Sequence, residues 1–273
     1  MDHIETKTNR PPVRVGIVGL GRAAFFNHLP ELKRLTGLFT VTAVCDLAKD
    51  RRDRIEAEFP NVHLYRRVED MLDDPDVDLV DIASRSADHV KHALASLKRN
   101  RWTLVESPFA LTLDDALVLR AADVKARGKL LVRHVGAFAP DFQLARKMLD
   151  DPRLGELYDI RVRQQLYVRR DDWQSVKRCG GGAAYYAAPD LVLQALALLR
   201  SPATQLWSEL KRVASLGDAE DFAHIVLKTR GQATADIEYS GAELAPVEPA
   251  FSLRGERGVF TVAPGASSGT LHV

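Results

Sequence analysis

The chain has few cysteines and almost no net charge. Its 273 residues include two cysteines, Cys45 and Cys179, whose spacing matches neither a disulfide framework nor a metal-binding motif. With 38 basic and 37 acidic residues, the formal net charge is +1, so no overall field draws in nucleic acid or an anionic membrane. We therefore expect a cytoplasmic protein that recognises its ligands locally and binds neither nucleic acid nor membrane.

Long apolar runs are also lacking. No stretch approaches the ~20 apolar residues of a membrane span, and residues 1–12 have no apolar core of a signal peptide. We expect these twelve residues to form a flexible tail that ends at Pro11 and Pro12. The composition, 46% hydrophobic and 27% charged, is that of a soluble globular protein with one to two domains.

Short apolar runs alternate with helical patterns over residues 13–133. The runs are VRVGIVGL, TVTAVCD, VDLVDIAS, WTLVES and KLLVR. This alternation predicts an α/β domain in which a Rossmann-type, doubly wound parallel sheet carries helices on both faces. Thr112 and Asp115 form an approximate capping box for the helix after Phe109.

The pattern changes over residues 134–273. The helical pattern FQLARKMLDD leads to the alternating run LYDIRVRQQLYVR, a CGGG cluster and an apolar helix around Leu191 to Leu199. Four further strand candidates lie near residues 206–213, 224–229, 234–239 and 259–262. Period-two patterns without intervening helices predict an α+β domain with a mainly antiparallel, open sheet.

The stretch VGIVGLGRAA has the form of a dinucleotide-binding loop. Gly19 permits a tight turn, Gly21 lets the backbone approach a phosphate, and Ala24 stands at the third glycine position. The next strand ends at Asp46, where a carboxylate can accept both ribose hydroxyls and repel a 2'-phosphate. This favours NAD, although Arg22 in the loop can reach phosphate, so NADP stays open.

These motifs, with the ESP turn and the CGGG cluster in this order, resemble the Gfo/Idh/MocA family of two-domain dehydrogenases. The likeness begins near Val13 and runs to the end, where the family's usual C-terminal segment is shortened. The resemblance implies that Ser84 lines the dinucleotide site and that Glu106 contacts the nicotinamide ribose. It also implies a homodimer or larger homo-oligomer that pairs through the open sheet.

The chain departs from this family at the positions that carry catalysis. Where relatives have Glu-Lys-Pro, this chain has Glu106, Ser107 and Pro108, and a serine hydroxyl is a poor acid or base near neutral pH. Tyr186 and Asp190 stand where the family often has an Asp and a His on one helix face. Either Tyr186, Asp190 and Ser107 give polar assistance to a reaction, or Tyr186 is a packed aromatic and Asp190 a solvated or capping acid.

A third departure lies in the family's sugar-binding stretch. It reads RHVGAFAP, in which Arg133 and His134 are the polar residues, and we interpret His134 as a packed histidine at the domain boundary. We predict no metal site.

Three hypotheses follow for the function. The first is an NAD(P)-dependent oxidoreductase with a rebuilt active site that acts on an unidentified small molecule. The second is a catalytically silent, nucleotide-binding regulatory protein on the same fold. The third is a structural subunit without a cofactor, which the intact glycine loop with Asp46 argues against.

Overall fold

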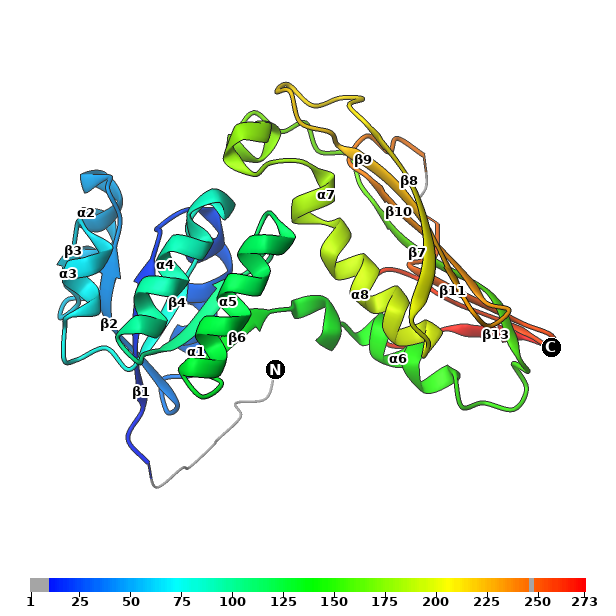
Figure 1. Cartoon of the computed structure of the whole chain (residues 1–273), viewed down its shortest axis with the longest axis horizontal. Coiled ribbons are helices and arrows are strands. Elements are labelled where there is room, and N and C mark those ends of the chain that lie inside the picture. The colour runs from blue at the N-terminus through cyan, green and yellow to red at the C-terminus, as the bar shows by residue number, and fades with distance from the viewer. Residues whose placement is uncertain (1–9, 246–247) are drawn as a thin grey trace. The chain divides into compact units, whose positions relative to one another are not determined.

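The computed structural model describes residues 10–245 and 248–273, so most of the expected tail at residues 1–12 lies outside the described residues. The chain divides into two compact units, of which the first ends at Arg133 and the second spans His134–Val273 (Figure 1). Each unit has its own sheet and its own hydrophobic core.

Unit 1 is built on a six-stranded sheet with the order β3-β2-β1-β4-β5-β6, in which every neighbouring pair is parallel. This confirms the predicted doubly wound parallel sheet. The strands are β1 (Val13–Val18), β2 (Phe39–Cys45), β3 (His63–Tyr65), β4 (Leu79–Ile82), β5 (Trp102–Glu106) and β6 (Leu130–Arg133). The short edge strand β3 was not predicted, because three residues are too few to establish an alternating pattern.

Helices cover both faces of this sheet, and two separate apolar clusters fill the space beneath them. One cluster centres on Ile17, Val44 and Leu29, and the other on Val18, Val80 and Leu97. The helical segments are the π-helix η1 (Ala24–His28), α1 (Leu29–Arg34), α2 (Lys49–Glu58), α3 (Val68–Leu72), α4 (Ser86–Lys98) and α5 (Leu113–Lys125).

Thr112 caps the helix after Phe109 as predicted, but Asp115 bonds the Thr112 hydroxyl instead of its backbone amide, so the capping box is formed only in part. Thr112 has an extended backbone at the N-cap of α5, and its hydroxyl accepts a hydrogen bond from the Asp115 amide at 3.1 Å. The same hydroxyl donates to the Asp115 carboxylate at 2.8 Å. Asp115, the third residue of the helix, therefore bonds the Thr112 hydroxyl through both its backbone amide and its carboxylate.

Unit 2 contains a seven-stranded sheet with the order β13-β12-β11-β7-β10-β9-β8. Among the strand pairs of the described residues, only β10 and β7 are parallel, which confirms the predicted, mainly antiparallel sheet. The strands are β7 (Leu157–Gln165), β8 (Ala203–Lys211), β9 (Phe222–Thr229), β10 (Thr234–Ser240), β11 (Phe251–Gly255), β12 (Val259–Val262) and β13 (Thr270–His272). Strands β11 and β13 were missed.

One face of this sheet is covered by the apolar helix α8 (Ala188–Leu199), which packs on β7 and β10 (Figure 1). The other helical segments are α6 (Pro140–Met148), α7 (Ala183–Tyr186) and the short 3-10 turns η2 (Val135–Phe138), η3 (Trp173–Ser175) and η4 (Lys177–Cys179). Alternate strand residues on the opposite face are charged, and Asp236 there contacts both Arg163 and His224 at 2.9 Å.

Within the described residues, the segment Lys177–Leu199 has the length and apolar composition of a membrane span, with half of its most apolar window buried. Gly180, with φ of 77°, and the non-helical Ala187 interrupt it. Its buried residues Leu191, Ala195 and Leu198 belong to the core of unit 2. We therefore interpret this segment as the core helix of unit 2.

The cap of α5 gives a direct test of the fold. Thr112→Ala should lower the free energy of unfolding by about 1 kcal/mol, because the Asp115 amide loses its acceptor. Urea unfolding followed by circular dichroism measures the change. Arg120→Ala, an exposed substitution in the same helix, is the matched control and should change stability by less than about 0.5 kcal/mol. Equal effects of the two substitutions would contradict the cap.

Candidate functional site

The glycine loop joins β1 to η1 and its first glycine is fixed by a close approach of two backbones. Gly19 has a φ of 90°, and a Cβ atom added there would lie 2.6 Å from the Cα of Ser84. No side chain fits this position. At Gly21, by contrast, an added Cβ would meet no atom within 4 Å, so the backbone there faces open space. Ala24 is fully buried at the start of η1, as close packing at the third position requires.

Asp46 follows β2 and is held against this loop. Its carboxylate accepts hydrogen bonds from the amides of Leu20 and Ala48, both at 2.8 Å. Arg51 lies 3.4 Å from the same carboxylate, and its own side chain is half exposed. Dinucleotide-binding folds use a carboxylate in this arrangement to recognise an adenosine ribose. Arg22 is an exposed residue of the same loop.

A buried histidine ties the end of β4 to the ESP turn after β5. The ring nitrogens of His89 lie 2.8 Å from the Pro108 carbonyl and 2.9 Å from the Ser84 carbonyl. The hydroxyl of Ser84 contacts His92 at 3.1 Å. The peptide bond between Ser107 and Pro108 is cis. Ser84 and the ESP turn are therefore fixed relative to each other.

Glu106 is part of a buried ionic network that the sequence reasoning missed. His28, at the end of η1, lies 2.6 Å from Asp81 through Nδ1 and 2.6 Å from Glu106 through Nε2. Arg133 donates to the same Glu106 oxygen at 2.9 Å, and the Ser107 amide donates to the other at 3.2 Å. The network joins the helix after the glycine loop to the ends of three strands.

Burial and charge act in opposite directions on this network. Burial alone lowers the pKa of His28, but the Asp81 and Glu106 carboxylates outweigh it and raise that pKa to about 9. Burial favours protonated Glu106, yet His28 and Arg133 lower the pKa of Glu106 below its ordinary value. His28 is therefore a cation at neutral pH, between two carboxylates.

The sequence contains one signal for this network. Asp81 is an acid inside the apolar strand VDLVDIAS, and a buried acid predicts a buried partner.

In unit 2, Tyr186 and Asp190 have different neighbours, although they are spaced four residues apart. Tyr186 packs edge to face on Tyr239, with ring centroids 5.4 Å apart, and Arg170 lies over its ring at 5.1 Å. Burial raises the pKa of the Tyr186 phenol above its ordinary value. The non-helical Ala187 separates α7 from α8 between the two residues.

Asp190 forms a pair with His134. The Nδ1 atom of His134 lies 2.6 Å from Asp190 Oδ1, and both side chains are about one-quarter exposed, at 25% and 27%. The neighbouring Gln194 donates to the Gly136 carbonyl at 2.8 Å and fixes the segment after His134 against α8. A histidine oriented by a carboxylate through Nδ1 presents Nε2 for proton transfer. The sequence gives no local signal for this pair, and His134 contacts Asp190 where the sequence indicated only a packed histidine.

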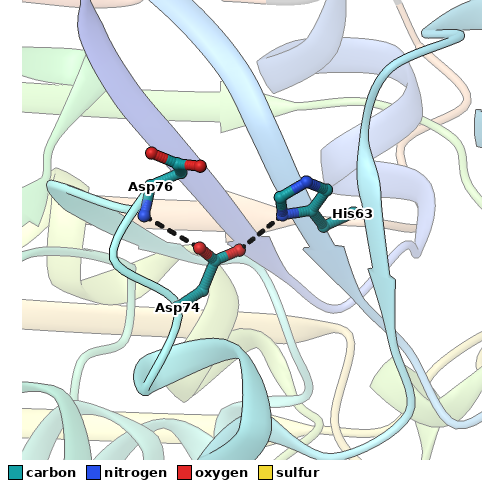
Figure 2. A group of neighbouring side chains, drawn as sticks. All are labelled: His63, Asp74 and Asp76. Carbon is teal, nitrogen blue, oxygen red and sulfur yellow. Dashed lines mark hydrogen bonds and ion pairs between the residues drawn. The ribbon is translucent and has the colours of Figure 1, made fainter.

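One further group has metal-ligand chemistry. Ligand atoms of His63, Asp74 and Asp76 lie within 4.8 Å of one another in unit 1 (Figure 2). The Asp74 oxygens accept from His63 at 2.8 Å, from the Tyr65 hydroxyl at 2.9 Å and from the Asp76 amide at 2.8 Å. Asp76 also receives the guanidinium of Arg14 at 2.6 Å. Hydrogen bonds thus account for this cluster as a link between β3 and the loop before β4.

Two family models match the chain. The model described as "Oxidoreductase family, NAD-binding Rossmann fold" matches residues 13–134, and the GFO/IDH/MocA C-terminal domain matches residues 142–261. Among curated relatives, the uncharacterized oxidoreductase YdgJ of Escherichia coli is 27% identical over 255 residues, which cover 91% of this chain and 70% of that protein. The scyllo-inositol 2-dehydrogenase (NADP(+)) IolW of Bacillus subtilis is 25% identical over 255 residues, or 91% of this chain and 68% of that protein.

Solved structures show the same fold. An NAD-binding protein from Listeria innocua superposes with a TM-score of 0.86 at 22% identity, covering 95% of this chain and 75% of that one. The WlbA dehydrogenase from Bordetella pertussis, in complex with NADH and UDP-GlcNAcA, has a TM-score of 0.82 at 22% identity and covers 91% of this chain and 78% of its own. Both likenesses concern the fold.

The two loop glycines should respond differently to the same added methyl group. Gly19→Ala should destabilise unit 1 by about 3 kcal/mol, because the methyl meets the Ser84 backbone and the φ is left-handed. Gly21→Ala should leave the melting temperature nearly unchanged but weaken NADH binding at least about tenfold, because its methyl occupies the open side of the loop. Thermal unfolding and NADH titration measure the two effects. Unchanged NADH affinity in a folded Gly21→Ala variant would rule out this loop as the phosphate site.

Proposed function

Because the chain belongs to the GFO/IDH/MocA oxidoreductase family, with the family's NAD-binding Rossmann domain as its first unit, we propose that it transfers a hydride between a nicotinamide dinucleotide and a small molecule bearing a hydroxyl or carbonyl group. The observation that carries the proposal is the contact of Asp46 with the glycine loop. Its carboxylate is held by the Leu20 amide beside the open backbone at Gly21, which fits the ribose and pyrophosphate of a dinucleotide.

NAD is the proposed cofactor. A carboxylate at Asp46 accepts ribose hydroxyls and repels a 2'-phosphate. Arg22 and Arg51 beside the loop provide the opposite charge, and the curated name of the relative IolW specifies NADP(+). The proposal therefore rests on Asp46 outweighing these cations, because it is fixed by two backbone amides while Arg51 is half exposed.

We propose that the His134 and Asp190 pair handles the proton that accompanies hydride transfer. The bound nicotinamide supplies the hydride chemistry, so the protein needs one group that gives or takes a proton. Asp190 orients His134 at 2.6 Å, and both are partly exposed. In this proposal Ser107 supplies a hydrogen-bond donor to the substrate, at the position where the family resemblance places a lysine. Tyr186 is the less suitable acid, because it is packed on Tyr239 and burial raises its phenol pKa.

A second candidate is a catalytically silent protein that binds nucleotide to regulate a partner. It is favoured by Ser107 at the place of the family's lysine and by the packed Tyr186. A structural subunit without cofactor is disfavoured, because the open backbone at Gly21 and the fixed Asp46 serve no purpose in a scaffold. Saturable NADH binding without turnover on any substrate would select the regulatory protein.

The proposal also includes a cytoplasmic homo-oligomer. The two free cysteines, Cys45 and Cys179, support a cytoplasmic location. The seven-stranded sheet, whose edge strand β8 is exposed at every residue, supports the homo-oligomer. The charged face of this sheet, with Arg163 and Asp236 in contact, is the surface through which we propose that copies pair.

Cofactor choice tests the role of Asp46. Asp46→Asn should weaken NADH binding at least about tenfold and shift the NADH to NADPH affinity ratio toward NADPH, because a charged acceptor is lost and a repulsion is removed. Nucleotide fluorescence and the shift in melting temperature measure both affinities. Asp53→Asn on α2, an exposed acid that pairs with Lys49, is the control and should leave the ratio unchanged. An unaltered ratio in the Asp46 variant would exclude it from cofactor choice.

The acid/base assignment is tested by turnover on a panel of sugars, polyols and their oxidised forms, followed through nicotinamide absorbance. On any substrate found, His134→Gln should lower kcat at least about a hundredfold, whereas Tyr186→Phe should lower it much less. Asp190→Asn should fall between them, because it removes only the orienting carboxylate. If Tyr186→Phe is the more damaging variant, the proton is carried by the phenol instead.

A further inference from the structure

The ionic network around His28 contains two carboxylates and two cations, although one cation would be enough to hold Glu106 in place. His28 and Asp81 have side chains that are 2% and 4% exposed. Asp81 Oδ2 contacts His28, while its Oδ1 is buried without a hydrogen-bond partner among the described residues. A buried carboxylate with an unsatisfied oxygen is costly and is held in place by the adjacent cation.

The charges in this network balance at neutral pH. His28 and Arg133 carry one positive charge each, and Asp81 and Glu106 carry one negative charge each. The charged groups that face His28 are Asp81 from β4 and Glu106 from β5, and Arg133 from β6 reaches it through Glu106. Loss of the His28 proton therefore leaves this four-residue network with one net negative charge. Glu106 and Arg133 are its partly exposed members, at 16% and 23%, and Glu106 is the member that the proposed function places beside the nicotinamide end of the cofactor.

We propose that the His28–Asp81 pair sets the relative affinity of the site for NAD+ and NADH through the net charge behind Glu106. This inference rests on the proposed function, because it requires that the nicotinamide end of the dinucleotide lies near Glu106. The oxidised nicotinamide ring is a cation and the reduced ring is neutral. A neutral network binds the two forms with little electrostatic preference, whereas a network of charge −1 favours the cation.

The position of His28 in the chain links its charge to the glycine loop. Helix η1 begins immediately after the glycine loop, and the Phe25 amide donates to the Gly21 carbonyl at 3.1 Å. His28 ends the same π-helix and reaches Asp81 and Glu106 from there. The segment that would bind pyrophosphate is therefore directly continuous with the residue that balances the charge at the other end of the cofactor. π-helical turns are often found at such functional positions.

The first measurement is the affinity for NAD+ and for NADH, by calorimetry and nucleotide fluorescence, between about pH 7 and about pH 10. For the unmodified protein, NAD+ affinity relative to NADH should rise at least about threefold as the pH passes through about 9, where His28 loses its proton. His28→Gln should show the high-pH ratio already at about pH 7 and no dependence on pH.

A double variant separates charge from structure. His28→Gln alone leaves Asp81 as an isolated buried carboxylate, whereas His28→Gln with Asp81→Asn restores a network of zero net charge and no buried charge at Asp81. The double variant should therefore recover the neutral-pH affinity ratio of the unmodified protein and keep it at all pH values. It should also recover most of the melting temperature lost in the single variant, because two amides can satisfy each other.

The dependence of the melting temperature on pH provides a readout that is independent of nucleotide binding. Because the folded pKa of His28 is raised, its stabilising contribution is complete below its unfolded pKa near 6.5 and is lost as the pH rises through about 9. Ser96→Ala, which removes the buried contact of Ser96 with Thr103 at 2.8 Å on β5, is the control. It should lower the melting temperature without changing the affinity ratio.

The outcomes distinguish the inference from the function on which it rests. Absence of saturable binding of NAD+ or NADH to the unmodified protein would defeat both. If both nucleotides bind but the ratio is the same at all pH values and in all variants, the proposed function stands and the inference is wrong. A ratio that changes in His28→Gln but not back in the double variant would show a steric effect, and would also overturn it.

Discussion

A carboxylate buried inside a parallel sheet governs how the first unit is assembled. Asp81 lies within β4 and is almost inaccessible to solvent. Folding would therefore bury an unpaired negative charge unless a cation contacted this carboxylate. His28 provides that cation, which fixes the end of η1 against the sheet and places the preceding glycine loop at the ends of β1 and β2. The close approach of Gly19 to the backbone of Ser84 also fixes the glycine loop against the segment that follows β4.

The repeating parts of this structure were predictable from the sequence and the long-range contacts were not. Alternation of apolar runs and helical patterns reports local periodicity, which is why the parallel sheet and the cap at Thr112 were found. The short strand β3 and the late strands β11 and β13 carry too little pattern to be recognised beside longer neighbours. Strand β8 was predicted near residues 206–213 and is observed at Ala203–Lys211, a shift typical of strand ends.

The candidate site shows the same division. Gly19, Gly21 and Asp46 belong to a motif with fixed spacing, so their positions followed from the sequence. His28 and Glu106 are separated by 78 residues, and His134 reaches Asp190 across 56 residues, so neither pair leaves a local signature. The spacing of Tyr186 and Asp190 suggested one helical face, but the break at Ala187 gives each its own neighbours.

The edge strand β8 has a consequence for how the protein behaves at high concentration. A nine-residue strand at the end of a sheet presents a row of backbone donors and acceptors to any other extended chain. Leu206 and Leu210 are exposed on it, so an added strand would bury apolar side chains as well as complete the ladder. Glu209 and Lys211, paired at 3.0 Å, are charged residues of the kind that oppose such addition. Colloidal stability thus depends on what occupies this edge more than on a net charge of +1.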